Sequence, residues 1–223
     1  MTLDLHHAHP FDVSPAEAAD VQRRLEPLVR ETLLDVAAVR TVGGLDVSVR
    51  GDRVRAAVVV LDAATLAPVD HATWEGPVAF PYVPGLLSFR EIPALLPALD
   101  RLRDLPDVLV LDGYGRAHPR RFGLACHLGV LLDRPAVGVA KSLFVGRHEA
   151  LGEDKGATAP LVHRGETVGM AVRTRARVLP VFVSVGHRCT LADAVDLTLA
   201  TTGRFKIPEP TRRAHHLSYS GTL

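Results

Sequence analysis

The first pattern along the chain is helical. From Ser14 to about Ala38, apolar residues recur at intervals of three to five positions, which is the spacing of one helix face. Ser14, Pro15 and Glu17 fit the N-cap, the first helical position and the capping-box glutamate of a helix start. The sequence therefore predicts an amphipathic helix here, with an apolar face formed by Ala18, Val21, Leu25, Leu28 and Leu33.

Three valine-rich runs follow, with the length and composition of β-strands. They cover residues 39–49, 54–62 and 68–75, and turn-forming residues separate them at 50–52 and 63–65. Because consecutive strands joined by tight turns pair side by side, we expect an antiparallel meander.

The second half of the chain alternates between helical and strand-like segments. After a loop rich in proline and glycine (PYVPG, residues 81–85), a helical stripe runs from Phe89 to Leu102, and we expect Pro93 to break that helix just after Glu91. The central strand-like runs are apolar throughout, as in strands buried on both faces. The predicted strands cover residues 108–111, 135–140, 161–163, 168–172 and 181–185, and the predicted helices cover residues 119–132 and 191–201.

These elements predict an α/β domain whose mixed sheet is covered by helices on both faces, in the order of a ribonuclease-H-like fold. A chain of 223 residues falls within the usual range for one domain. We expect residues 14–223 to form that domain. Residues 1–13 are expected to form a flexible tail in which His6, His7 and His9 are solvated.

Charge and cysteine content exclude several classes of protein. With 26 basic and 25 acidic residues, the chain is no polycation that coats nucleic acid, so any such contact must be local. Cys126 and Cys189 match no CxxC spacing, which argues against a disulfide framework or a zinc site. The N-terminus lacks a leader pattern and no apolar run is long enough to span a membrane, so we expect a cytoplasmic monomer.

Two aspartates occupy positions where a carboxylate is costly. Asp46 lies within an apolar strand (VGGLDVSV), and Asp112 follows the buried run VLVL and directly precedes Gly113. On neighbouring strands, they would bring oxygen ligands to one point, which suits Mg²⁺ and metal-assisted phosphodiester hydrolysis. The alternative is structural: Asp112 would cap a strand end, and Asp46 would bond to a buried turn.

Further polar residues lie close to these aspartates in the expected fold. Glu91, at the expected helix break, would complete a carboxylate cluster, although a solvated Arg90–Glu91 pair is the alternative. Lys141 is one of only three lysines and follows the strand at 135–140, where its ammonium could meet a phosphate. A lysine that extends to solvent is the alternative.

Three more side chains are candidates for contacts with nucleic acid. His118 combines a titratable group with the charges of Arg120 and Arg121. Tyr82 stands in the stiff PYVPG loop, where an exposed ring could stack on bases, unless it simply packs on the neighbouring prolines. His215 belongs to a basic C-terminal segment. Asp193, by contrast, fits a capping box with Thr190 and is expected to cap a helix.

Taken together, five segments resemble the endonuclease V family in both sequence and order. The two longest place Pro, Gly, His and Arg in a pattern that packing alone does not require, and the resemblance covers almost the whole chain beyond about residue 15. The segments are GLDVSV (44–49), PYVPGLLSFRE (81–91), LDGYGRAHPRRFGLACHLG (111–129), GVAKSLF (138–144) and PEPTRRAH (208–215).

The resemblance implies a ribonuclease-H-like, metal-dependent endonuclease for DNA repair. Asp46 and Asp112 would bind Mg²⁺, with Mn²⁺ as a substitute, and Glu91 and His215 would complete the centre or support it. Lys141 would lie near the scissile phosphate. The PTRxAH register favours His215 over the adjacent His216.

For the nucleic acid, the resemblance implies DNA with deaminated bases such as deoxyinosine. Tyr82 would fill the space of the displaced base, His118 would be the motif histidine, and Gly113 and Gly115 would let backbone groups approach a flipped hypoxanthine. Family members hydrolyse the second phosphodiester bond 3′ to the lesion, leaving a 3′-hydroxyl and a 5′-phosphate. An inosine-specific ribonuclease with the same centre, and a non-catalytic nucleic-acid-binding module, are the alternatives.

Overall fold

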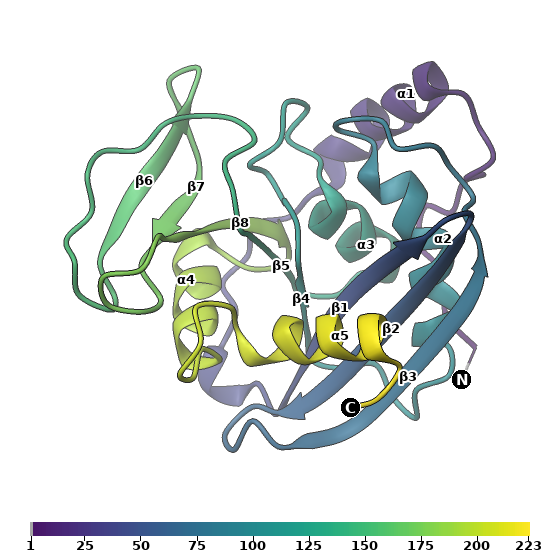
Figure 1. The fold of residues 1–223 in the computed structure, drawn as a ribbon. Helices are drawn as coiled ribbons and strands as arrows, with labels where there is room; N and C mark the ends of the chain where they lie inside the picture. Colours follow the sequence, from purple (N-terminus) through teal and green to yellow (C-terminus); the bar gives the residue numbers. More distant parts are fainter. Residues whose placement is uncertain (1) are drawn as a thin grey trace.

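A single eight-stranded sheet organises the protein, as a computed structural model that describes residues 2–223 shows (Figure 1). The strand order is β3-β2-β1-β4-β5-β8-β7-β6. The strands are β1 (Thr41–Arg50), β2 (Arg53–Asp62), β3 (Pro68–Pro77), β4 (Val108–Leu111), β5 (Ala136–Ala140), β6 (Thr158–His163), β7 (Glu166–Val172) and β8 (Val181–His187).

The directions of the strands confirm the predicted mixed sheet. Strands β1, β2 and β3 form the expected antiparallel meander, whereas β1, β4 and β5 run parallel to one another. Strand β8 then reverses direction beside β5, and β7 and β6 continue antiparallel. Strands β4 and β5 are buried along their whole length, as their continuous apolar runs predicted.

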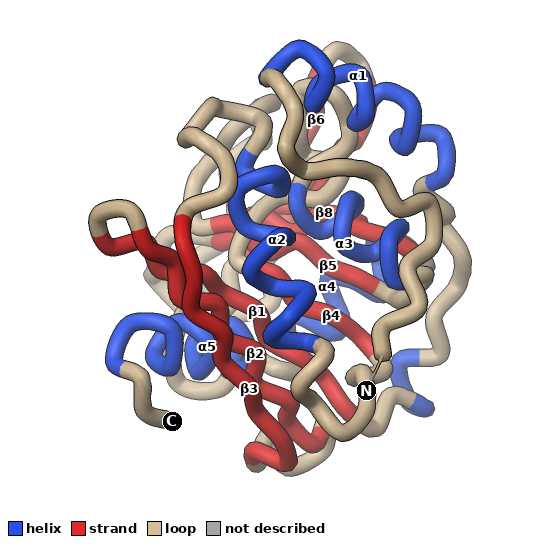
Figure 2. The backbone as a smooth tube through the Cα atoms, turned by 90° about the vertical axis from the view of Figure 1, so that its right-hand side faces the viewer, coloured by secondary structure: helices blue, strands red, loops and turns tan. Residues whose placement is uncertain are grey.

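Helices cover both faces of the sheet (Figure 2). Helices α2 and α3 pack on one face, while α4 and α5 pack on the other, where α5 crosses β1 and β2. The predicted α/β class, a mixed sheet with helices on both faces, is therefore confirmed. The helices are α1 (Pro15–Leu25), α2 (Leu87–Leu99), α3 (Leu124–Leu132), α4 (Leu191–Ala200) and α5 (Glu209–Ser220).

Two predicted helix boundaries were wrong, namely the end of α1 and the start of α3. Helix α1 has the expected capping box of Ser14 and Glu17 but ends at Leu25, and Leu33, which had extended its apolar stripe, is 85% exposed. Helix α3 starts at Leu124 rather than at residue 119, because Arg121 adopts a left-handed conformation (φ 56°) that a helix cannot contain.

Helix α2 continues through Pro93, where we had expected a break, and through Pro97 as well. A proline inside a helix costs about 3 kcal/mol. Ile92, Leu95 and Leu99 are at most 1% exposed on the face that packs against the sheet, and each contributes roughly 1.5–3 kcal/mol by burial. This packing offsets the two prolines and keeps Glu91 inside a continuous helix.

The N-terminal segment lies along the face that carries α2 and α3. Leu3, Leu5 and Phe11 pack against the core there, and the amide of His6 donates to the carbonyl of Leu131. His9 is half-buried rather than solvated, because its ring stacks on His127. His6 and His7 are exposed, as expected.

Cys126 and Cys189 are buried free thiols, in agreement with the sequence. Burial raises the pKa of Cys189 to about 12 and raises that of Cys126 as well. Within residues 2–223, none of the helices is both long and apolar enough to cross a membrane.

Candidate active site

The two aspartates of the predicted metal site meet at the centre of the sheet. Strands β1 and β4 are parallel neighbours in which Leu45 pairs with Leu111, so Asp46 and Asp112 follow at adjacent positions. Their side chains are only 11% and 18% exposed. Burial and the charge of Asp46 both raise the pKa of Asp112, while its ion pair with Lys141 acts in the opposite direction.

Glu91 brings a third carboxylate to the same point from helix α2. Burial, followed by the negative charges of Asp46 and Asp112, holds the pKa of Glu91 well above its usual value. The side chain is therefore part of the cluster and not a solvated partner of Arg90. The uninterrupted helix through Pro93 is what places it there.

A lysine and a histidine also lie against the aspartates. Lys141, directly after β5, forms an ion pair with Oδ2 of Asp112. From α5, Nδ1 of His215 lies 3.3 Å from Oδ2 of Asp46. His216, the other histidine in the register, is exposed one position further along the helix.

Ser218 is a member of the site that the sequence reasoning missed. It is fully buried, and its hydroxyl donates to the same Asp46 oxygen that faces His215. The three-residue spacing from His215 puts both side chains on one face of α5, and that spacing was the signal available in the sequence.

The donor set fits a hard cation such as Mg²⁺. Asp46, Glu91 and Asp112 crowd three carboxylates into a partly buried space, and the raised pKa values of Glu91 and Asp112 show that their negative charge is incompletely balanced. Among residues 2–223, no three Asp, Glu, His or Cys groups are arranged so that together they could hold a metal ion, so the protein would supply only part of the coordination shell. An open set of this kind matches Mg²⁺, which keeps waters and takes only one or two carboxylates.

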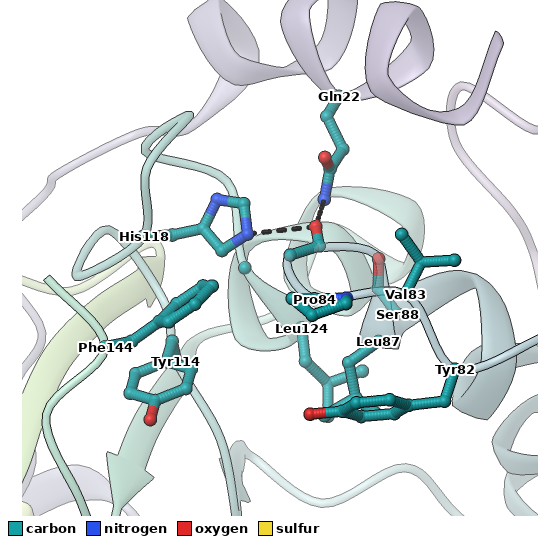
Figure 3. A pocket seen from close by; sticks show the side chains of 12 residues that line it. Gln22, Tyr82, Val83, Pro84, Leu87, Ser88, Tyr114, His118, Leu124 and Phe144 are labelled. Carbon is teal, nitrogen blue, oxygen red and sulfur yellow. Dashed lines mark hydrogen bonds between the residues drawn. The ribbon is translucent and has the colours of Figure 1, made fainter. Parts of the chain in front are cut away.

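A pocket lined in part by aromatic side chains lies between the segments that lead to Glu91 and Asp112, and Figure 3 shows its lining. One wall comes from the PYVPG loop and the start of α2, and the other from residues 114–124, so both walls continue directly into carboxylate-bearing segments. Tyr82 stands at its edge with 69% of its surface exposed, which makes its ring available to a ligand. The lining includes Tyr82, Leu87, Tyr114, His118, Leu124 and Phe144.

His118 lines this pocket, but both of its ring nitrogens are occupied. Nδ1 accepts a hydrogen bond from the amide of Arg120, so Nε2 carries the proton and donates to the carbonyl of Gly85 at 3.0 Å. Burial, together with the charges of Arg120 and Arg121, lowers the pKa of His118 to about 4. The imidazole is therefore neutral near pH 7.

Gly113 and Gly115, which follow Asp112, differ in the space available for a side chain. A Cβ on Gly115 would lie 2.0 Å from the carbonyl oxygen of Val185, and the Gly115 amide already donates to Ser184. A Cβ on Gly113 would make only ordinary contacts with Leu124. Packing alone accounts for Gly115, whereas a side-chain methyl group would fit at Gly113 without a clash.

Asp193 caps a helix, as predicted from the sequence. It forms a capping box with Thr190 at the start of α4 and also accepts the amide of Leu34.

Comparisons with known proteins point to one family. The sequence model of the Endonuclease V family matches residues 23–216. An Endonuclease V from Roseiflexus castenholzii is 48% identical over 215 residues, which cover 96% of each chain. The crystal structure of Endonuclease V from Streptomyces avermitilis superposes with a TM-score of 0.89 at 48% identity, covering 99% of this chain and 97% of that one.

A more distant relative was solved with nucleic acid. Endonuclease V from Ciona intestinalis, in complex with a 24mer DNA containing an inosine followed by a ribo-adenosine, superposes with a TM-score of 0.81 at 28% identity. That match covers 92% of this chain and 96% of the other. Because the family match spans most of the sequence and the fold agrees along nearly its whole length, this chain belongs to the endonuclease V family.

Proposed function

We propose that this protein is a Mg²⁺-dependent repair endonuclease that hydrolyses the second phosphodiester bond 3′ to deoxyinosine in DNA, leaving a 3′-hydroxyl and a 5′-phosphate. The observation that carries the proposal is the convergence of Asp46, Glu91 and Asp112 beside an aromatic pocket. The first feature suits phosphodiester hydrolysis, and the second suits the capture of a displaced base.

Asp46 and Asp112 are the residues we expect to hold Mg²⁺, and Mn²⁺ is expected to substitute for it. When bound, such an ion neutralises the developing charge of the phosphate and lowers the pKa of an attacking water. Glu91 faces both aspartates, so its carboxylate is placed to orient that water. Ser218 and His215 fix the orientation of Asp46 through its Oδ2.

Lys141 is expected to stabilise charge on the scissile phosphate. Its ammonium already lies against Asp112, so it is within reach of any phosphate bound between the aspartate and solvent. Lysine is suited to this role because its charge is compact and can turn between neighbouring oxygens.

The pocket provides the second half of the mechanism. Turning a base out of the stack costs a few kcal/mol, and least for a mispaired base such as inosine. We propose that the base enters between Leu87 and Tyr114, while Tyr82 occupies the space left in the duplex. We expect Gly113, which has no side chain, to let backbone groups approach the base, and His118 to contact the base from the pocket lining.

DNA is the substrate we propose, in keeping with the Ciona relative, which was solved with a 24mer DNA containing an inosine followed by a ribo-adenosine. We further propose that residues 14–223 act as a single catalytic domain, as a monomer, in the cytoplasm.

The test is cleavage of an end-labelled duplex that contains one deoxyinosine, with Mg²⁺ or with EDTA. An undamaged duplex and an inosine-containing RNA run alongside as comparisons. We expect Mg²⁺-dependent cutting one nucleotide beyond the lesion and none of the undamaged strand. Stronger cutting of the RNA would support the inosine-specific ribonuclease instead, and binding without cutting would support the non-catalytic module.

A further inference from the structure

We propose that Gln22 and Arg120 are positioning residues that clamp the PYVPG loop to the 118–123 loop. The clamp keeps the base pocket in the shape that admits a displaced base. The inference rests on the function proposed above and adds to it residues outside the carboxylate cluster. Gln22 comes from α1, far along the sequence from both walls of the pocket, and directly precedes the segment matched by the family model.

The clamp converges on one atom, the carbonyl oxygen of Gly85. It accepts hydrogen bonds from Gln22 Nε2 at 3.0 Å, His118 Nε2 at 3.0 Å and Arg120 Nη2 at 2.8 Å, and Figure 3 shows the first two. A carbonyl oxygen has two lone pairs, so three donors saturate it. The loop is thus tied to α1 and to the opposite wall of the pocket at a single point.

Gln22 uses every polar atom of its side chain in this arrangement. It is 1% exposed, its amide nitrogen also donates to the carbonyl of Phe122 at 3.0 Å, and its Oε1 accepts from Arg120 Nε at 2.6 Å. One buried side chain therefore connects three segments. Leaving such groups without partners would be costly, which makes the arrangement specific.

Gly85 itself is required by the clamp. Its φ of +82° lies in the left-handed region, and a Cβ there would come within 2.8 Å of Arg120 Nη2. The loop conformation and the position of the guanidinium therefore depend on each other. Tyr82, Val83 and Pro84, which line the pocket, precede this fixed point directly.

The side-chain hydrogen bonds of Gln22 and Arg120 go to Gly85, to Phe122 and to each other, so loss of the clamp should weaken capture of the base and leave the bond-breaking step intact. The predicted signature is a rise in KM with an unchanged kcat.

The experiment compares Gln22→Met and Arg120→Met with Arg23→Met, an exposed arginine on the same helix as Gln22. On a deoxyinosine duplex we expect the first two variants to raise KM at least 10-fold with kcat within 2-fold of the wild type. A 2-aminopurine next to the lesion should report a matching loss of base displacement, and Arg23→Met should behave as wild type. A lower kcat at unchanged KM, or no change in either constant, would overturn the proposal.

A second measurement separates this inference from the proposed function. Amide hydrogen exchange on the free protein should become faster in residues 82–87 of both clamp variants and stay unchanged in β4 and β5. If the wild type cuts nothing yet exchange rises as expected, the proposed function fails and the clamp stands. If hydrogen exchange in residues 82–87 is unchanged in both variants, the proposed clamp is disproved, whether or not the protein cleaves the duplex. Arg120→Met, at a half-exposed position, serves if Gln22→Met does not fold.

Discussion

Nδ1 of His215 lies 3.3 Å from Oδ2 of Asp46, although 169 positions separate the two residues in the chain. Helix α5 crosses β1 on the face opposite α2, so the carboxylates receive Glu91 from one face and His215 with Ser218 from the other. Gly44, two residues before Asp46, permits this crossing, because a Cβ there would lie 2.0 Å from the carbonyl oxygen of Pro210. The site is therefore enclosed by two helices that the strand order alone does not bring together.

Replacing Asp46 or Asp112 by Asn should abolish cutting while binding to inosine-containing duplex is retained, because the change removes a cation ligand and keeps the shape. Cleavage and gel-shift assays on the same duplex check this, with the exposed Asp196→Asn on α4 as the matched control. Retained cutting by either site variant would disprove the metal assignment.

Lys141→Ala should reduce the cleavage rate on the order of 100-fold, the usual cost of removing one group that stabilises transition-state charge. The Mg²⁺ concentration for half-maximal cutting should not rise, since the ammonium no longer competes for Asp112. A Mg²⁺ titration of the cleavage rate measures both, and Lys155→Ala is the control. A higher Mg²⁺ requirement would instead place Lys141 among the groups that support the metal.

The contact between the half-buried His9 and the buried His127 should make stability depend on pH. Their Nε2 atoms are 2.7 Å apart, and Nδ1 of His127 bonds to Ser88. Burial lowers the pKa of both rings below the unfolded value of 6.5. The folded state therefore binds fewer protons than the unfolded state, and stability present above pH 6.5 is lost as the pH falls below it, by up to about 1.4 kcal/mol per pH unit for each ring.

Thermal denaturation between pH 8 and pH 5 tests this. In the double variant His9→Leu/His127→Leu, the melting temperature should decrease less as the pH falls than it does in the wild type. The control is His71→Leu, which replaces an exposed histidine on β3 and should leave that decrease unchanged. An unchanged slope in the double variant would show that other groups govern the acid sensitivity.

Gly115→Ala and Gly113→Ala form a matched pair two residues apart. The first forces a Cβ against the Val185 carbonyl and should destabilise the protein by about 2–3 kcal/mol, lowering the melting temperature by roughly 5–10 °C. The second meets only Leu124 at 3.5 Å and should cost less than about 1 kcal/mol. Equal losses in calorimetry would contradict the packing assigned to Gly115.

Much of the fold could be predicted because its signals are local. The capping boxes at Ser14 and Thr190, the valine-rich run of β2 and the apolar runs of β4 and β5 each depend on neighbouring residues, and all were confirmed. Asp46 and Asp112 could be singled out for a similar local reason, since a carboxylate inside or directly after a buried strand is costly enough to stand out in a sequence.

Only the tertiary structure decided how long the helices are and which distant side chains meet. Burial of the α2 stripe overrides two prolines, and exposure of Leu33 removes the reason to extend α1. Ser218 on Asp46, His9 on His127 and Gln22 on Gly85 join segments with no shared periodicity. Such contacts depend on how helices cross the sheet, which is set by packing across the whole core, whereas hydrophobic period and capping are set within a few residues.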